Sequence, residues 1–365
     1  MDDSRRLVCN EWDIYANAMD LHGKQGASKL FDVARTINSK ENARKMAELL
    51  EHFCPDVVHL NNIHYHLTPS VLVEAARFKR RRGHVGIVMT AHDYHYVVPC
   101  DGCMDNTSYE VCDACLDGHY SRCIGRRCAR GGLAKNIVSA AESYYWHGKN
   151  AYQLLDRVIC PCAVLKEKYD KVAEFRGRTV HIPNFTNLER RSYAKDRYVL
   201  YFGGYYRNKG VGTLLDVAEK HPEIDFRFAG RGDYAERMAS LPNVTDLGFM
   251  TGEDLFEVVG RATLTVLPSE WLENSPFAVL EALCCGTPVL AANVGGIPEL
   301  VGDGVTGELF RFRDEEDLER RLVSLWNDPA RCARYAENCR DFEPMTEVRY
   351  LDLLNDVYKE AMARD

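Results

Sequence analysis

The sequence lacks the features of several protein classes. It has no run of eighteen apolar residues, so no transmembrane helix is predicted. Its first residues, Met1 to Arg6, lack the apolar core of a signal peptide. Basic side chains are not in excess, since 46 Lys and Arg face 54 Asp and Glu for a net charge of −8. A nucleic-acid backbone favours a basic surface. We therefore expect a soluble, cytoplasmic protein that does not bind nucleic acid.

The chain also lacks the common nucleotide-binding motifs. Gly203–Gly210 lies between an apolar stretch and a predicted helix, but it has neither Walker nor dinucleotide spacing. Its glycines still let the backbone approach a ligand, and Lys209 near a helix start can meet a phosphate. A second glycine-containing loop, Gly230–Asp233, also precedes a helix. These loops predict phosphate or nucleotide binding of a less common kind.

With 365 residues and 46% hydrophobic content, the chain can form two domains. Short apolar strands alternate with helical periodicity in both halves, which predicts α/β domains with parallel sheets. The charged stretch Asn187–Arg197 marks a boundary. We predict a first domain at 1–186, a second at 187–344, and a terminal helix at 345–365 that can pack back on the first domain.

Fourteen cysteines are present, and six of them lie within residues 100–128. The six are Cys100, Cys103, Cys112, Cys115, Cys123 and Cys128. Two Cys-x2-Cys pairs followed by a third close pair resemble the spacing of structural zinc sites. A metal would supply folding energy to a loop-rich insertion. Reduced thiols are the main alternative, and disulfides or another metal come after that. Nothing in the segment indicates an open catalytic position.

The stretch Glu270–Glu299 predicts a ligand site. An apolar strand at 262–268 leads into a polar loop, and Ser275-Pro276 is a helix-start signal with serine as the cap. We expect this helix to end at Gly286 and to bury four apolar side chains: Phe277, Val279, Leu280 and Leu283. The next strand is predicted at 289–292. Such a unit places helix amides at the carboxyl edge of a parallel sheet, where a phosphate can bind.

Two carboxylates mark this stretch, Glu273 in the loop and Glu281 in the helix. Eight residues at about 100° each do not bring them onto one helix face, so they would serve different parts of a ligand. A structural alternative has equal weight: a helix-start acid and an acid bonded to backbone or arginine.

In the first half, His92 and Asp93 follow an apolar strand at 85–90, the position where α/β enzymes keep reactive groups. A histidine that hydrogen-bonds across a loop is the alternative. The basic run Lys79–Arg82 closes a helix, which suits the negative helix end. Contact with anionic lipid is the less favoured interpretation and would make the protein peripheral to the membrane.

Ten motifs follow one another along the chain: Pro55–His59, Thr90–Tyr94, Ile182–Asn184, Phe202–Gly210, Phe228–Gly232, Leu247–Phe249, Pro268-Ser269, Glu273 with Glu281, Gly286–Val289 and Gly295–Glu299. Taken in this order, they resemble the motifs of the retaining glycosyltransferases of family four, which have the GT-B fold. The cysteine-rich insertion narrows the likeness to bacterial enzymes of capsule, exopolysaccharide or O-antigen assembly. The resemblance implies two Rossmann-like domains facing a cleft that holds a UDP- or GDP-sugar. The acceptor would be a glycan or lipid-linked sugar.

The resemblance also implies residue roles. Lys209 would neutralise the diphosphate, Glu281 would bind the ribose, and Glu273 and His92 would contact the transferring sugar. No catalytic metal is implied. The remaining donor-binding residues would be Gly203, Gly204, Arg207, Gly230, Arg231, Phe249, Met250, Asn274, Ser275, Pro276 and Phe277.

Two departures stand out. The family usually has an arginine where this chain has Gly204, and Arg207 is the candidate replacement. Met1–Lys40 does not show the strand and Gly-Gly loop that open these enzymes, so the first domain is expected to lack its first strands. The alternatives are therefore a sugar-nucleotide binder without transferase activity, or a GT-B sugar-nucleotide epimerase.

Overall fold

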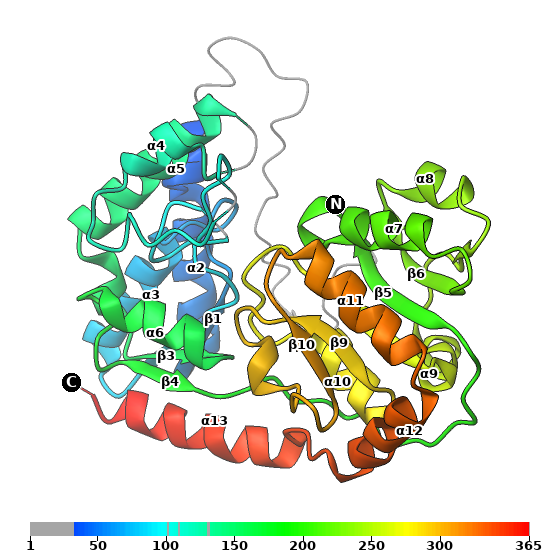
Figure 1. Cartoon of the computed structure of the whole chain (residues 1–365). Coiled ribbons are helices and arrows are strands. Elements are labelled where there is room, and N and C mark those ends of the chain that lie inside the picture. Colours follow the sequence, from blue (N-terminus) through cyan, green and yellow to red (C-terminus); the bar gives the residue numbers. More distant parts are fainter. Residues whose placement is uncertain (1–32, 101, 109, 130–131, 365) are drawn as a thin grey trace. The chain divides into compact units, whose positions relative to one another are not determined.

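The computed structural model describes residues 33–100, 102–108, 110–129 and 132–364, and the chain divides into two compact units (Figure 1). Unit 1 comprises Met1–Ile182 and Leu351–Asp365, and unit 2 comprises Pro183–Tyr350. The predicted divisions at 186/187 and 344/345 differ from these borders by four and six residues. Most of the expectation about Met1–Lys40 falls on residues 1–32, outside the described residues, and stays a prediction.

The described part of unit 1 contains a parallel sheet with the order β1-β2-β3-β4. Its strands are β1 (Val57–Asn61), β2 (Gly86–Thr90), β3 (Arg157–Cys160) and β4 (Thr179–His181). Every residue of β2 is buried, as its apolar composition predicts for a central parallel strand. The helices are α2 (Lys40–Phe53), α3 (Ser70–Arg82), α4 (Arg122–Arg126), α5 (Leu133–Gly148), η2 (Ala151–Leu154), α6 (Ala163–Lys171) and α13 (Glu347–Met362).

The end of α13 packs against the start of β2. A Cβ atom at Gly86 would lie 3.0 Å from Ala361 Cβ and 3.1 Å from Met362 N. About one turn earlier in the helix, the Tyr358 hydroxyl lies 2.7 Å from His59 Nδ1. The last residues of α13 therefore complete the packing around β1 and β2, although they follow unit 2 in the sequence.

Unit 2 is built on a six-stranded parallel sheet with the order β10-β9-β8-β5-β6-β7. Its strands are β5 (Val199–Tyr205), β6 (Phe226–Gly232), β7 (Val244–Asp246), β8 (Leu264–Leu267), β9 (Val289–Ala292) and β10 (Gly307–Phe310). Its helices are η3 (Arg207–Lys209), α7 (Val211–Lys220), α8 (Ala235–Ala239), α9 (Gly252–Arg261), α10 (Phe277–Cys284), η4 (Ile297–Glu299), α11 (Glu315–Trp326), α12 (Pro329–Asn338) and η5 (Cys339–Asp341).

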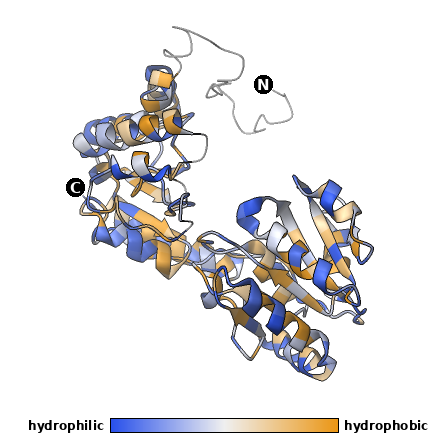
Figure 2. Cartoon of the chain, turned by 45° about the horizontal axis from the view of Figure 1, so that its top comes forward, coloured by the Kyte–Doolittle hydropathy of each residue, from blue (hydrophilic) through white to orange (hydrophobic). Residues whose placement is uncertain are grey.

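The core of each unit lies at its sheet. Figure 2 shows much of the hydrophobic colour on the strands of both sheets and more hydrophilic colour on the helices. All four residues of β8 and all four of β9 are buried, so helices cover both faces of the sheet there. In the described parts of the chain, no helix is both long and apolar enough to span a membrane.

Candidate active site

The connection pattern of unit 2 determines where its ligand site should lie. β5 and β8 are neighbours, but the chain proceeds outward from β5 toward β7 and outward from β8 toward β10. At such a reversal the loops beyond the carboxyl ends separate, and open α/β sheets bind ligands in that crevice. The loop after β5 carries Lys209, and the loop after β8 carries Glu273. Both predicted residues therefore lie at the switch point.

A cavity of about 330 Å³ opens at this edge of unit 2. This volume is at the lower end of the range for small-molecule sites. The ends of β5 and β6, the residues after β5 and β7, and helices α9 and α10 line the cavity. The lining residues are Phe202, Gly203, Gly204, Tyr206, Ala229, Gly230, Arg231, Phe249, Met250, Leu255, Ala278 and Glu281. Seven residues predicted from separate motifs are thus brought together.

Glycine is required at position 230 because two strands approach closely there. Gly230 pairs with Gly203 across β5 and β6, and a Cβ atom at 230 would lie 1.9 Å from the Gly203 carbonyl oxygen. Beside it, the Arg231 guanidinium lies 4.7 Å from the centroid of the Phe249 ring, which is 62% exposed. An exposed aromatic ring beside a cavity is a suitable stacking surface for a planar ligand group.

Glu281 has the electrostatic environment of a ligand-binding carboxylate. It lines the cavity from α10, and burial raises its pKa above the ordinary glutamate value. Among the described residues, no side chain forms a hydrogen bond or ion pair with this carboxylate. An unpaired, partly buried carboxylate is costly unless a ligand satisfies it. The structural alternative, an acid bonded to arginine or backbone, therefore has no support at Glu281.

Glu273 and Lys209 form an ion pair. Lys209 Nζ lies 2.7 Å from Glu273 Oε1, which also accepts a hydrogen bond of 2.7 Å from the Ser269 hydroxyl. The Glu273 residue is only 6% exposed. A carboxylate this buried needs a charged partner, and Lys209 supplies it. The ammonium group has two further N–H bonds for another acceptor.

A glycine loop fixes the backbone of Glu273. The Gly296 N–H donates to the Glu273 carbonyl oxygen at 2.8 Å. A Cβ atom at Gly295 would lie 2.0 Å from that same oxygen, and Gly295 has a φ of +59°. Both the left-handed conformation and the close approach therefore require glycine. The Gly295-Gly296 motif holds the Glu273 loop in place rather than lining the cavity.

The helix start after Glu273 differs from the prediction. The N-cap of α10 is Pro276, no side chain caps the helix, and the Ser275 hydroxyl is buried without a hydrogen-bond partner. The predicted serine cap is therefore wrong. Phe277 was expected in the core, but it is 53% exposed. Val279, Leu280 and Leu283 are buried, as predicted. Without a side-chain cap, the first-turn N–H groups can bind a ligand.

Unsatisfied polar atoms gather on the loops that carry Lys209 and Glu273. Asn208 Oδ1, Trp271 Nε1 and Ser275 Oγ are buried and make no hydrogen bond. Such atoms are uncommon in folded proteins, and polar groups of a bound ligand could satisfy them. Sequence reasoning did not assign a role to Asn208 or Trp271, although they lie within the predicted stretches Phe202–Gly210 and Glu270–Glu299. Their hydrogen-bonding side chains in loops at a sheet edge were the available signal.

The position of the expected arginine is covered by an aromatic ring. A Cβ atom at Gly204 would lie 2.6 Å from the Tyr206 ring, so a larger residue there would displace Tyr206. Tyr206 lines the cavity and is 48% exposed. Arg207, the candidate replacement, is exposed in η3 and does not line the cavity. Sequence analysis did not identify Tyr206 as a cavity residue, because a glycine in the sequence does not show which side chain packs against it.

In unit 1, His92 lies at the carboxyl edge of the sheet. Its Nε2 is 2.9 Å from the side-chain oxygen of Asn61, the last residue of β1. An amide oxygen only accepts, so Nε2 carries the hydrogen and Nδ1 is the acceptor. Burial of the ring lowers the His92 pKa, and the nearby Asp93 carboxylate opposes this shift. His92 is therefore a neutral hydrogen-bonding group at neutral pH.

Asp93 has a structural position instead. Its Oδ1 accepts from the His95 N–H at 2.9 Å, and its carbonyl oxygen accepts from the Tyr169 hydroxyl at 2.9 Å. His95 in turn lies 3.1 Å from the buried Glu142 carboxylate. Of the two predicted residues, only His92 presents an exposed side chain at this edge.

The six cysteines of the insertion are all buried. Burial raises the pKa of Cys115 to about 11 and that of Cys123 to about 12, with the neighbouring cysteines adding to both shifts. Neutral thiols are therefore favoured when no metal is bound. Within the described ranges, no three His, Cys, Asp or Glu side chains are placed to hold a metal ion. The structural zinc site therefore stays a prediction.

Comparison with known proteins finds a family match in the second half of the chain. Residues 187–342 match the model of the family described as glycosyl transferases group 1. An uncharacterized glycosyltransferase of Methanocaldococcus jannaschii is 26% identical over 235 residues, 58% of this chain and 66% of that protein. EpsD of Bacillus subtilis, whose name assigns it provisionally to the glycosyltransferases, is 24% identical over 341 residues, 88% of this chain and 81% of EpsD.

These matches are partial in length. The chain spans less than two thirds of the first curated relatives that it matches, with 66%, 26% and 41% of their lengths covered. Among solved structures, HepE of Anabaena in complex with UDP has a TM-score of 0.61 at 19% identity. That match covers 86% of this chain and 80% of HepE. The predicted α/β fold of the GT-B type, with a Rossmann-like sheet in each domain, is confirmed.

Proposed function

We propose that this chain, whose residues 187–342 match the model of the glycosyl transferases group 1, transfers a sugar from a nucleotide-sugar donor to an acceptor. The acceptor would be a glycan or a lipid-linked sugar in polysaccharide biosynthesis, and the anomeric configuration would be retained. The observation that carries the proposal is Glu281, a partly buried carboxylate without a described partner in a cavity at the switch point.

In this proposal the nucleotide binds in the 330 Å³ cavity. The Glu281 carboxylate accepts hydrogen bonds from the two ribose hydroxyls, which would satisfy its unpaired charge. The base lies beside Arg231, Phe249 and Met250, where the exposed Phe249 ring offers a stacking surface. HepE, which shares the fold, has been solved with UDP and with UDP-glucose, which supports a nucleotide-sugar donor, a UDP- or GDP-sugar, for this chain.

The diphosphate would be stabilised by Lys209 and by the uncapped start of α10. The Lys209 ammonium can donate to a phosphate oxygen while it keeps its bond to Glu273, because it has three N–H bonds. The α10 amides add fixed dipoles directed at the leaving group as negative charge develops on it. These groups supply electrostatic stabilisation from the chain itself, without a step that depends on a bound metal ion.

The transferring sugar would be oriented by Glu273 and His92. Glu273 has a second carboxylate oxygen that can accept from a sugar hydroxyl, and His92 is an exposed, neutral hydrogen-bonding side chain. Neither residue is assigned as a covalent nucleophile. The acceptor hydroxyl attacks the anomeric carbon on the face from which the nucleoside diphosphate departs, and its proton leaves with the diphosphate. This transition state is oxocarbenium-like, as in glycoside hydrolysis.

The test is donor-dependent release of a nucleoside diphosphate, followed by NMR of the product. Release of UDP with an axial or equatorial product linkage matching the donor supports retaining transfer. Nucleotide binding without transfer across an acceptor panel would identify a binding protein instead. A sugar isomerised without acceptor would identify an epimerase. If no common sugar nucleotide binds or turns over, the proposal is wrong.

A further inference from the structure

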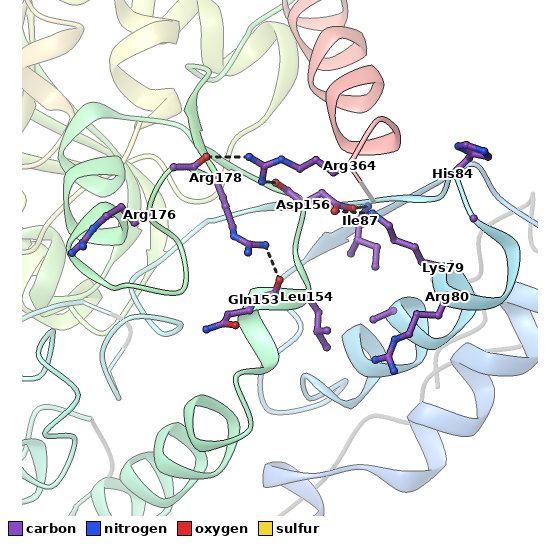
Figure 3. Close-up of a pocket in the computed structure, with 13 residues that line it drawn as sticks. Lys79, Arg80, His84, Ile87, Gln153, Leu154, Asp156, Arg176, Arg178 and Arg364 are labelled. Atoms are coloured by element: carbon purple, nitrogen blue, oxygen red, sulfur yellow. Dashed lines mark hydrogen bonds and ion pairs between the residues drawn. The ribbon is translucent and has the colours of Figure 1, made fainter.

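Unit 1 contains a basic cavity at the edge of its sheet opposite His92. Its volume is about 750 Å³, and Figure 3 shows its basic side chains coming from several separate segments. The segments are the end of α3, the turn before β2, the residues before β3, the turn before β4 and the chain after α13. Each lies at the amino end of a strand or beside one. At about 3.3 Å per residue, the five residues of β2 place this cavity roughly 16 Å from the edge that carries His92.

Positive charge dominates the lining. Five cationic side chains and one histidine face a single carboxylate: Lys79, Arg80, Arg176, Arg178 and Arg364 with His84, against Asp156. The whole chain has a net charge of −8, so this concentration is the reverse of the overall balance. An excess of cations in one cavity raises the local concentration of anions.

Both oxygens of the Asp156 carboxylate accept hydrogen bonds from within unit 1. Asp156 is 7% exposed; its Oδ1 accepts from Lys79 Nζ at 2.8 Å and its Oδ2 accepts from the Ile87 N–H at 2.7 Å. Asp156 therefore neutralises the charge of Lys79 and fixes the backbone at the start of β2. Among the described residues it leaves the arginines of the cavity without a carboxylate within ion-pair distance.

The arginines are held by uncharged groups. Arg364 donates to the carbonyl oxygens of Asp156 at 2.8 Å and Gly177 at 3.4 Å, and Arg178 donates to the carbonyl oxygen of Gln153 at 2.6 Å. These bonds fix two guanidinium groups without cancelling their charge (Figure 3). Burial lowers the Arg364 pKa, and the neighbouring Arg157 and Arg178 lower it further. Arg157 itself is paired with Glu360 at 2.8 Å.

We infer that this cavity binds an anion bearing phosphate groups, at a site separate from the donor site. Arginine suits this ligand because its planar fork of N–H groups matches phosphate oxygens. Two arginines fixed by the backbone would position a phosphate group, and exposed Arg80 and Arg176 would close around it. The ligand is a soluble polyphosphate compound or a phospholipid headgroup, which share this chemistry. The inference does not depend on the proposed transferase activity.

The experiment measures binding of inorganic pyrophosphate by calorimetry, at low and at physiological salt, with the full chain. The double variant Arg80→Gln/Arg176→Gln should weaken binding at this site about tenfold or more, since it removes two charge-assisted contacts. These side chains anchor no strand, so the variant should melt like the wild type. The matched control is Arg77→Gln/Arg81→Gln, which removes two exposed charges from α3 that are paired with Glu74 and Glu51.

The donor site could also bind pyrophosphate, so the same titration is made with Lys209→Met. Binding that survives Lys209→Met and is lost in Arg80→Gln/Arg176→Gln supports the inference. Equal affinity in the wild type, the cavity variant and the control would overturn it, as would no binding of pyrophosphate or vesicles at low salt. Sedimentation with phosphatidylglycerol vesicles, against phosphatidylcholine vesicles, separates the sources. Vesicle binding that needs Arg80 and Arg176 indicates a lipid headgroup, whereas pyrophosphate binding alone indicates a soluble ligand.

Discussion

The carboxyl edges of the two sheets differ in how they carry charge. In unit 2 this edge holds an ion pair, Lys209 with the buried Glu273, and the unpaired carboxylate of Glu281. In unit 1 the same edge carries the uncharged ring of His92, and the uncompensated cations lie at the opposite edge. The difference indicates that unit 2 supplies the electrostatics of the proposed reaction, whereas unit 1 adds neutral hydrogen bonds.

The largest expected effect comes from breaking the ion pair of unit 2. Lys209→Met should lower turnover by about 10²–10³-fold, the usual effect of removing one electrostatic donor to a developing anion. It also leaves Glu273 buried with only the Ser269 bond, so the melting temperature should fall. UDP release measures the turnover, and thermal unfolding measures the melting temperature.

A second variant separates charge neutralisation from catalysis. Lys209→Met/Glu273→Gln removes both charges and should recover most of the stability without recovering turnover. The control Lys220→Met removes an exposed lysine at the end of α7 and should change neither. Full turnover in the double variant would show that Lys209 only supports the fold.

Replacement of Gly295 tests whether the donor edge depends on a rigid loop. Gly295→Ala places a Cβ atom against the Glu273 carbonyl, in addition to the strain of a positive φ. Gly304→Ala is the matched control, because Gly304 has a φ of +74° but open space around its Cβ position. The control should cost about 1–2 kcal/mol of unfolding free energy from strain. Gly295→Ala should cost about 1–3 kcal/mol more from overpacking, measured by denaturant unfolding. Equal costs would contradict the role of the close approach.

Substitution of Glu281 probes nucleotide binding directly. Glu281→Gln should weaken UDP binding by about 1–3 kcal/mol, the value for a charge-assisted hydrogen bond. Glu257→Gln, which removes an exposed carboxylate from α9, should leave binding unchanged. Calorimetry measures both affinities. Wild-type affinity in Glu281→Gln would exclude the ribose role.

The raised pKa of Glu281 also predicts a pH dependence. The ionised form binds the ribose, and burial moves the pKa of the free protein above the ordinary glutamate value of 4.5. UDP affinity should therefore be constant at neutral pH and should fall as the pH drops through that raised pKa. The decline should begin at a higher pH than an ordinary glutamate would give, and it should be absent in Glu281→Gln.

The smallest effect is expected in unit 1. His92→Ala removes one neutral hydrogen bond, so kcat/KM should fall by about 1–2 kcal/mol, roughly 5–30-fold, with little change in UDP affinity. His119→Ala is the control, because His119 is an exposed histidine of the cysteine-rich insertion. A fall in UDP affinity as large as that of Glu281→Gln would contradict the proposal that His92 contacts the sugar rather than the nucleotide.

Sequence patterns predicted the strands of unit 2 well because parallel strands buried on both faces are continuous apolar runs. The predicted strand at 289–292 has the observed bounds. Patterns located Glu281 and Lys209 through motif order, and the cavity brings Glu281 together with the glycines and Phe249. They failed where a side chain's neighbour lies far away in sequence. The hydrophobicity of Phe277 could not show that its side chain is exposed while Val279 and Leu280 of the same turn are buried. Ser275 is a residue type that often caps helices, but it forms no capping hydrogen bond here.

The basic cavity of unit 1 was unpredictable for the same reason. The run Lys79–Arg82 was visible, but its partners Arg176, Arg178 and Arg364 are about 100 and 280 residues away. Only the fold shows that the Asp156 carboxylate is shared between Lys79 and the start of β2. The spacing of residues along the sequence cannot predict an excess of positive charge when five separate segments contribute the charged side chains.

The packing of the end of α13 against β2 has a consequence for biosynthesis. Unit 2 is one continuous segment, whereas unit 1 needs residues 351–365, which the ribosome adds after all of unit 2. Domains generally fold as units during synthesis, with the first-made ones earliest. Here the order should be reversed, with unit 2 able to fold while the contact of Ala361 with Gly86 is still unmade. Until residues 351–365 are made and packed, nascent unit 1 would expose part of its sheet. We expect a chaperone to bind it at that stage.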